Sequence, residues 1–232
     1  MKFTKQFIDV LSTFNKINKN MYFAKGTIQT SILTGNNKDS ILLFARANTN
    51  VHIENSFAIG DLSKLISVLK LFDNPEINIQ ESNLYIHEGN KQVSYTLSNP
   101  EFLSYDKNPD RIQVGVGIEA EMTKKDVHDL LEILPVFKLE HVSFIGKDGK
   151  FLIKAHNPDN PSTDQETIEI GTTDESFVAT IKSSYLTIPK DWYKVTVSRK
   201  GYVHFKNGPQ SINGEVYEFL IPVEKNYSHL KG

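Results

Sequence analysis

The chain has 232 residues, of which 39% are hydrophobic and 23% are charged. This balance is typical of a soluble globular protein, and the length suits one large domain or two domains of about 100–120 residues. There is no cysteine, which excludes a disulfide framework, a cysteine-based zinc site and a cysteine nucleophile. The 26 basic and 28 acidic residues give a net charge of −2, whereas nucleic-acid-binding domains are usually strongly basic.

The first residues lack the apolar core of a signal peptide, and no apolar run approaches the about 20 residues of a membrane span. We therefore expect an intracellular protein without a membrane partner.

The first half of the chain predicts two amphipathic helices among antiparallel strands. Thr4 and Asp61 stand where N-caps are expected, and Lys25-Gly26 suggests a hairpin between the first two strands. The expected elements are a helix at 5–18, strands at 21–24, 27–33, 40–47 and 50–59, a helix at 61–72, and strands at 77–80, 84–88 and 92–97.

The second half predicts the same kinds of elements in a similar order. Thr123 and Asp126 form a capping signature, and Pro189 ends the last helix. The expected elements are a strand at 114–121, a helix at 123–137, strands at 140–146, 150–156, 165–171 and 176–182, a short helix at 183–188, and strands at 193–199, 202–206 and 215–223.

Between these halves, residues 98–113 contain two prolines and little periodicity, which indicates a connector. We therefore expect two domains, 1–107 and 108–232.

Short sequence segments that match between the two halves, in the same order, support an internal duplication. The offsets between them run from 117 to 120 residues. The pairs are Thr4-Lys5 with Thr123-Lys124, Ser56-Phe57 with Ser176-Phe177, Ile77-Asn78-Ile79 with Val195-Thr196-Val197, and Tyr85-Ile86-His87 with Tyr202-Val203-His204.

No motif for catalysis or nucleotide binding is present. The chain has no phosphate loop, no dinucleotide-binding glycine motif and no His-Glu-x-x-His, and no two histidines have helical metal-ligand spacing. Asp126, Asp129 and Glu132 are more typical of a solvated helix face than of an acid–base pair. We expect no metal, no cofactor and no enzymatic activity, although an enzyme whose site is assembled only by folding stays open as an alternative.

The expected helices direct lysines away from their apolar stripes. Lysine outnumbers arginine 23 to three, and a flexible point charge suits sequence-independent contact with phosphates better than base reading. The lysines concerned are Lys5, Lys16 and Lys19 on the first helix, Lys64 and Lys70 on the second, Lys124 and Lys125 on the third, and Lys182 at the fourth. An ordinary solvated helix face is the alternative interpretation.

The opening MKFTKQFIDVLSTFNKIN, the segment FAIGDLSKLISVLKLFDNPEINI at 57–79, the length and the duplicated pattern together resemble the sliding clamps of T-even-type bacteriophages. The resemblance implies an α+β DNA clamp fold with two similar domains. Each domain would have two helices packed on antiparallel sheets, and three copies would close into a ring.

The resemblance also implies a function and partners. Such a homotrimeric ring encircles duplex DNA without reading its sequence and tethers the phage DNA polymerase, which confers processivity. A clamp-loader ATPase opens the ring, and late-transcription factors use it once it is on DNA. The protein would then act in the cytoplasm of the host cell.

By position, the lysines named above would face the central hole, although the acidic residues of the third helix put its contribution in doubt. A pocket for a partner peptide is expected beside the connector, and the alternative is that its residues only hold the connector down. The pocket residues would be Phe102, Leu103, Tyr105, Ile221 and Pro222.

The net charge of −2 conceals an uneven distribution. Residues 1–25 contain five lysines and one acid, whereas residues 157–175 contain six acids and no lysine or arginine. A clamp needs only its inner helices to be basic, so the average does not exclude DNA. The alternative from another class is a β-rich structural or assembly subunit without a DNA role.

Overall fold

The computed structural model describes residues 1–35, 41–103, 105, 115–160, 162, 164–208 and 216–230. The chain forms two compact units, Met1–Pro109 and Asp110–Gly232. None of the described helices combines the length and apolar character that a membrane span needs.

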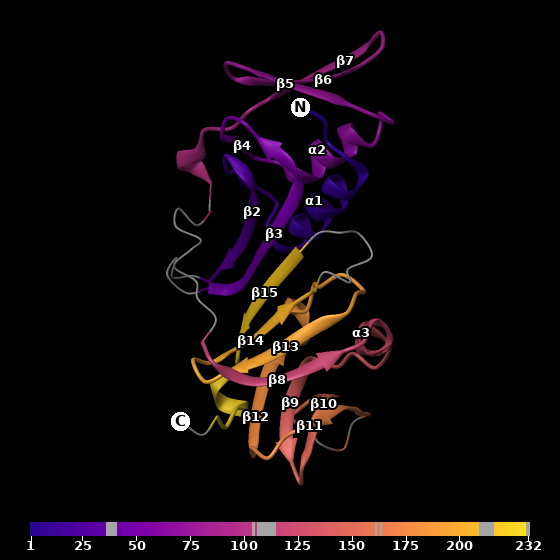
Figure 1. Cartoon of the computed structure of the whole chain (residues 1–232), viewed down its shortest axis with the longest axis vertical. Coiled ribbons are helices and arrows are strands. Elements are labelled where there is room, and N and C mark those ends of the chain that lie inside the picture. The colour runs from indigo at the N-terminus through magenta and orange to yellow at the C-terminus, as the bar shows by residue number, and fades with distance from the viewer. Residues whose placement is uncertain are drawn as a thin grey trace. The chain divides into compact units, whose positions relative to one another are not determined.

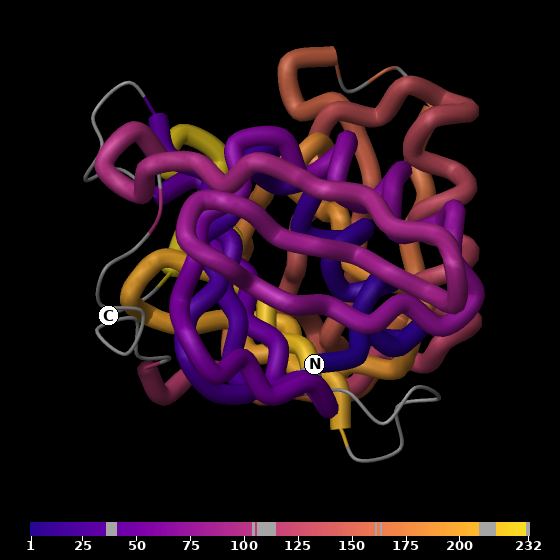
Figure 2. Tube along the Cα trace, turned by 90° about the horizontal axis from the view of Figure 1, so that it is seen from above, coloured from indigo at the N-terminus to yellow at the C-terminus, as the bar shows by residue number. Residues whose placement is uncertain are grey.

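The first unit packs two helices against antiparallel strands (Figure 1). Strand β1 pairs with β4, β2 pairs with β3, and β5, β6 and β7 form a meander that can be followed in Figure 2. The elements are α1 (Lys5–Ile17), β1 (Met21–Phe23), β2 (Gly26–Thr34), β3 (Ile41–Ile53), β4 (Phe57–Ile59), α2 (Leu62–Leu69), β5 (Glu76–Gln80), β6 (Asn83–Glu88), β7 (Lys91–Thr96) and the 3-10 turn η1 (Pro100–Phe102).

The second unit has a similar strand arrangement with one helix fewer. Strand β9 pairs with β12, β10 pairs with β11, and β13, β14 and β15 again form a meander. In addition, β9 pairs with β10 and β8 pairs with β13. The elements are β8 (Gly117–Met122), α3 (Lys124–Val136), β9 (His141–Lys147), β10 (Lys150–His156), β11 (Glu166–Thr172), β12 (Phe177–Lys182), the 3-10 turn η3 (Ser183–Tyr185), β13 (Tyr193–Ser198), β14 (Tyr202–Lys206), β15 (Val216–Pro222) and the 3-10 turn η4 (Lys225–Tyr227).

The short segments that match between the two halves of the sequence lie at equivalent positions in the two units. Thr4 and Thr123 are the N-caps of α1 and α3, and Phe57 and Phe177 begin β4 and β12. In both units the first strand after the leading helix pairs with the fourth. The predicted duplication is therefore present in the fold.

The hairpin predicted at Lys25-Gly26 is wrong. Strand β1 pairs with β4, with Met21 opposite Ile59, rather than with β2. The Gln29 side chain explains how this is accommodated. It accepts a hydrogen bond from the Ala24 amide at 3.0 Å and donates one to the Ala24 carbonyl at 2.9 Å. A side chain thus satisfies backbone groups that a hairpin partner would otherwise take.

The strands predicted at 40–47 and 50–59 also divide differently. Strand β3 runs unbroken through Ile41–Ile53, and β4 is a separate strand of three residues. A break was expected at residues 48 and 49. The Thr49 hydroxyl instead donates to the Thr27 carbonyl of β2 at 2.9 Å, which keeps this segment in the strand.

The helix predicted at 183–188 is only the 3-10 turn η3, so the described part of the second unit has one α-helix where two were expected. Leu186 and Ile188 are both buried, and a spacing of two residues fits extended chain rather than a helix face. The Ser183 amide and hydroxyl donate to the carbonyls of Glu140 and Leu139, which ties the segment to the start of β9.

Each unit has its own aromatic core. In the first, Phe7 of α1 packs edge-on against Phe3 with ring centroids 4.7 Å apart, and Phe23 stacks on Phe57 at 4.4 Å. In the second, Phe144 and Tyr193 both meet Phe205 edge-on. Burial of Tyr193 raises the pKa of its hydroxyl, which therefore stays protonated and donates to the Pro189 carbonyl.

Candidate nucleic-acid interface

Helix α1 begins at a Thr4 cap, whose hydroxyl accepts from the Phe7 amide at 3.2 Å. Its apolar stripe is buried against β2, β3 and α2, which leaves the opposite stripe in solvent. The buried apolar residues of the helix are Phe7, Val10, Leu11, Phe14 and Ile17.

The exposed stripe of α1 is basic. Lys5 and Lys16 are exposed on the helix and Lys19 is exposed just beyond its end, with Asp9 as the acidic residue of that stripe. Among the residues that the structure describes, none of these lysines forms an ion pair. Their charges are therefore available to an external anion.

Helix α2 lies beside α1 (Figure 1). The Leu62 amide donates to the Lys19 carbonyl at 2.7 Å, and the Ser63 hydroxyl donates to Asn15 at 2.9 Å. Lys64 is exposed on this helix, and Lys70 is exposed at its C-cap. The Lys64 ammonium is 5.6 Å from the centroid of the Tyr95 ring, within cation–π range.

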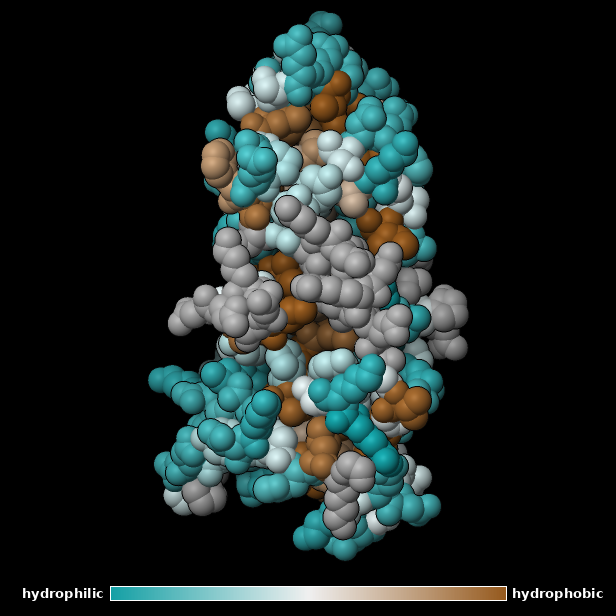
Figure 3. Space-filling model, turned by 90° about the vertical axis from the view of Figure 1, so that its left-hand side faces the viewer, coloured by the Kyte–Doolittle hydropathy of each residue, from teal (hydrophilic) through white to brown (hydrophobic). Residues whose placement is uncertain are grey.

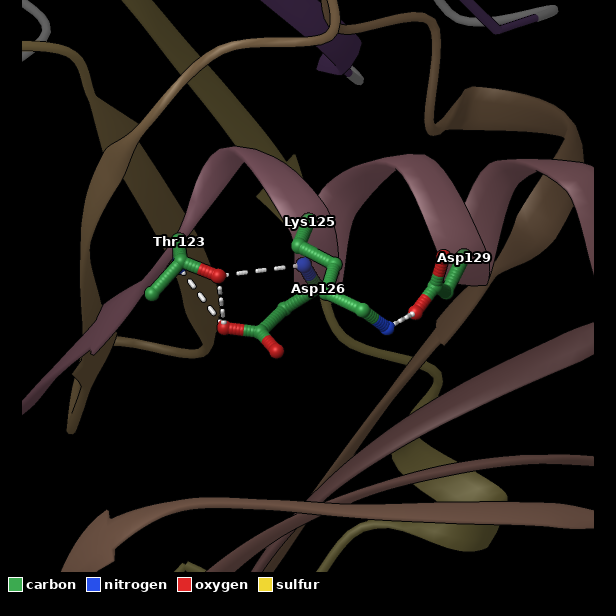
Figure 4. Close-up of polar contacts among 4 residues, drawn as sticks. All are labelled: Thr123, Lys125, Asp126 and Asp129. Atoms are coloured by element: carbon green, nitrogen blue, oxygen red, sulfur yellow. Dashed lines mark hydrogen bonds and ion pairs between the residues drawn. The ribbon is translucent and has the colours of Figure 1, made fainter.

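Helix α3 differs from α1 because its polar side chains bind one another (Figure 4). Thr123 and Asp126 form the predicted capping box: the Asp126 carboxylate accepts from the Thr123 amide at 2.8 Å, and the Thr123 hydroxyl accepts from the Asp126 amide at 3.2 Å. Lys125 forms an ion pair with Asp129 one turn later. The hydrogen bond that the Lys125 ammonium donates to the Asp129 carboxylate raises the pKa of Lys125.

A second ion pair ties α3 to the chain before β13. Lys190 forms an ion pair with Glu132 of α3. The Nδ1 atom of His128, one turn earlier on the helix, is 4.0 Å from the same carboxylate. The hydrogen bond from Lys190 lowers the pKa of the Glu132 carboxyl. Lys124 is exposed and forms no ion pair with any described residue.

Lys182 lies at the end of β12 rather than on a fourth helix. Its ammonium is 3.8 Å from a carboxylate oxygen of Glu224. Of the eight lysines proposed to face DNA, it is one of two that have an acidic partner among the described residues, the other being Lys125.

The connector side of the proposed partner pocket belongs to the first unit. Phe102 ends η1 and has 84% of its surface exposed, a high value for an aromatic side chain. Leu103 is half-buried, and Tyr105 stacks on Tyr22 with ring centroids 4.4 Å apart. The Tyr105 contact fits the alternative in which these residues hold the connector down, whereas Phe102 has no such role.

The other proposed pocket residues, Ile221 and Pro222, belong to β15 of the second unit. Ile221 is fully buried and lies opposite Val203, whereas Pro222 is half-buried opposite Tyr202. Ile221 thus offers no surface of its own to a partner, and the pocket as a whole stays a prediction.

Two surface features have no counterpart among the predictions from sequence. A groove of about 690 Å³ lies on the sheet of β8, β13 and β14, with Lys194 paired to Glu119 at 2.7 Å. Apolar side chains are exposed at two helix ends, Leu71 after α2 and Val136 and Phe137 at the end of α3. Leu71 and Val136 lie off the apolar stripes of their helices, which was the available signal. Phe137 lies three residues after the buried Leu134, in step with the stripe, so the sequence predicted it to be buried and its exposure is a correction. On the face drawn in Figure 3, apolar atoms occur in several separate spots among hydrophilic ones.

The described residues contain no group of three or more His, Asp or Glu side chains that could hold a metal ion.

No family model matches the chain. It is similar in sequence to the sliding clamp of Vibrio phage KVP40, with 25% identity over 214 residues that cover 88% of this chain and 94% of that protein. The predicted resemblance to phage clamps is confirmed by this match.

Solved structures of similar fold are proliferating cell nuclear antigens. That of Entamoeba histolytica has a TM-score of 0.69 at 11% identity and covers 96% of this chain and 97% of its own. That of Thermococcus kodakaraensis has a TM-score of 0.68 at 14% identity, with 97% and 99% covered. That of A. fulgidus, bound to the C-terminal region of FEN-1, has a TM-score of 0.71 at 11% identity, with 100% and 98% covered. The predicted clamp fold is confirmed.

Proposed function

We propose that this chain is the subunit of a sliding clamp, a protein without enzymatic activity that encircles duplex DNA as a homotrimeric ring and tethers a phage DNA polymerase. The observation that carries the proposal is a similarity to a phage sliding clamp over nearly the whole of both chains, together with the clamp fold. The exposed lysines of α1 and α2 supply a basic surface for the duplex.

The proposed mechanism is retention by topology. A closed ring leaves the duplex only at an end or by opening, so its residence time does not depend on tight contacts. Lysine–phosphate attraction is screened by salt and independent of sequence, so it centres the duplex without holding one position. Strong contacts would instead slow sliding.

Ring closure requires a head-to-tail interface, and strands at the ends of the described sheets offer edges for it. Among the described pairings, β7 and β11 each bond a neighbour on one side only, as the last strands of their sheets. We propose that β7 of one copy pairs with β11 of the next, which also covers both edges. The exposed apolar residues Leu71, Val136 and Phe137 would lose their solvent contact in the same interface.

Further partners follow from the proposed function. A clamp-loader ATPase would open the ring, and the polymerase and late-transcription factors would use the region of Phe102, the most exposed aromatic side chain of the connector. The A. fulgidus protein, whose structure holds the C-terminal region of FEN-1, supports the general idea that such folds dock partner peptides. The site of action would be the host cytoplasm.

Two measurements test this function. Light scattering at micromolar concentration should give three times the 26.3 kDa of one chain, and the protein should lengthen the products of its cognate polymerase on primed circular DNA. Phe137→Asp should dissociate the trimer, and Phe102→Ala should leave the trimer intact while it weakens stimulation of the polymerase. A strictly monomeric protein that does not stimulate the polymerase would instead support a structural subunit without a DNA role.

A further inference from the structure

The two leading helices of the duplicated units differ in how their charges are satisfied. In the first unit Lys5, Lys16 and Lys19 are exposed and form no ion pair among the described residues. Asp9 is the one acidic residue along the helix. The α1 surface therefore carries uncompensated positive charge.

On α3 the corresponding surface is neutral overall. Three basic residues, Lys124, Lys125 and Lys190, stand against three acidic ones, Asp126, Asp129 and Glu132. Lys125 is bound to Asp129 and Lys190 to Glu132, while Asp126 is held at the helix start by its bonds to Thr123 (Figure 4). Each of the three acidic side chains is thus bound to a described residue, and Lys124 is the one basic residue of the three without an ion pair among the described residues.

Ion pairing determines the distance over which the charges of each helix attract a phosphate. The field of a close ion pair nearly cancels at distances larger than the pair itself. The field of a lone ammonium reaches about 8 Å at physiological ionic strength before screening removes it. A duplex that slides through a ring without fixed contacts is attracted mainly by the lone charges.

We propose that the lysines of α1, Lys5, Lys16 and Lys19, attract the duplex, whereas the acidic partners on α3 keep Lys125 and Lys190 from acting on it. This inference rests on the proposed clamp function. In a trimer it gives three attracting surfaces that alternate with three neutral ones. The neutral surfaces keep the hole polar and hydrated without adding phosphate contacts that would slow sliding.

Three variants of the full chain separate the contributions. K5Q/K16Q/K19Q removes three positive charges from the region of α1. K124Q/K125Q/K190Q removes three positive charges from α3 and from Lys190, which binds α3. D129N/E132Q removes the acids and leaves the lysines. Light scattering and circular dichroism first establish that each variant has the wild-type mass and fold. Binding to a short fluorescent duplex with free ends is then followed by anisotropy over a range of KCl concentrations.

The expected result is a difference in salt dependence. Each phosphate contact contributes about 0.9 to the slope of log affinity against log salt, and each lysine recurs in all three subunits. The α1 variant loses three unpaired lysines in each subunit, and its slope should fall by up to about 8. The α3 variant loses only one unpaired lysine, Lys124, and its slope should fall by at most about 3. D129N/E132Q should bind more tightly than wild type, because it releases Lys125 and Lys190.

Equal losses for the two lysine variants, or no gain for D129N/E132Q, would overturn the inference. Competition with closed circular DNA tests ring formation separately. A closed ring reaches the duplex only over a free end, so circular DNA should not compete for it. Competition by circles as strong as that by free-ended duplex would overturn the clamp function, while the comparison of variants still decides which helix carries the attraction. Absence of any wild-type binding would overturn both.

Discussion

Gly146, one residue before the end of β9, is a position where the fold has no room for a side chain. It lies opposite Phe151 of β10 and Phe177 of β12, whose rings meet edge-on at 5.2 Å. A methyl group at Gly146 would come within 2.2 Å of the Glu175 carbonyl oxygen and 2.4 Å of the Phe177 ring. Gly146→Ala is therefore expected to destabilise the second unit strongly.

The magnitude follows from what can move. Overpacking in a core typically costs about 1–3 kcal/mol, and more where the obstacle cannot yield. The Phe177 ring is buried and the carbonyl belongs to the backbone, so we expect a loss of at least about 3 kcal/mol in the free energy of unfolding. With a urea dependence of about 2 kcal/mol per molar, the unfolding midpoint should fall by about 1.5 M.

Gly149→Ala provides the matched control three residues away. Gly149 has φ of +79°, and no atom lies within 4 Å of the place that an added methyl group would take, so only backbone strain of about 1–2 kcal/mol is expected. Urea unfolding followed by the fluorescence of Trp192, the single tryptophan, reports on the unit concerned. A midpoint for Gly146→Ala no lower than that of Gly149→Ala would refute the packing argument.

Two further changes test local features of the second unit. Thr123→Ala should cost about 1 kcal/mol of stability by removing the capping box of α3, whereas Thr123→Ser should retain most of it; urea midpoints of the two variants decide. Burial lowers the pKa of His156, with a smaller effect of Lys154, so the unfolded chain takes up the proton first as the pH falls. Stability should therefore be fully present above the ordinary histidine pKa of 6.5 and decline below it, and His156→Asn should flatten this decline in urea midpoints measured at several pH values.

Much of the secondary structure follows from local signals. The helix at 5–18 and its Thr4 cap are present, because a stripe of large apolar residues at helical spacing and a capping hydroxyl act within a few residues. The three strands of the β5–β7 meander lie within one residue of their predicted bounds at either end. Short turns leave such strands few other partners.

Pairing over long distances could not be predicted in this way. Nothing in the residues 21–23 indicates that β1 bonds β4, 36 residues later, instead of β2 beside it. The side chain of Gln29, which serves the Ala24 backbone, could be assigned that role only once the fold had placed it there. The same holds for η3, where burial of Leu186 and Ile188 outweighed a short helical signal.

The candidate site likewise has features that local sequence predicts and features that depend on the tertiary structure. The sequence by itself determined the duplication, the capped amphipathic helices and the outward position of their lysines, because periodicity alone decides which face of a helix is polar. Only the tertiary structure decided which of those lysines are paired with acidic side chains. Lys190 meets Glu132 across 58 residues of chain, and the Lys125–Asp129 pair depends on side-chain conformation. A charge acts at a distance only when no opposite charge lies beside it, and that proximity is a property of the folded chain.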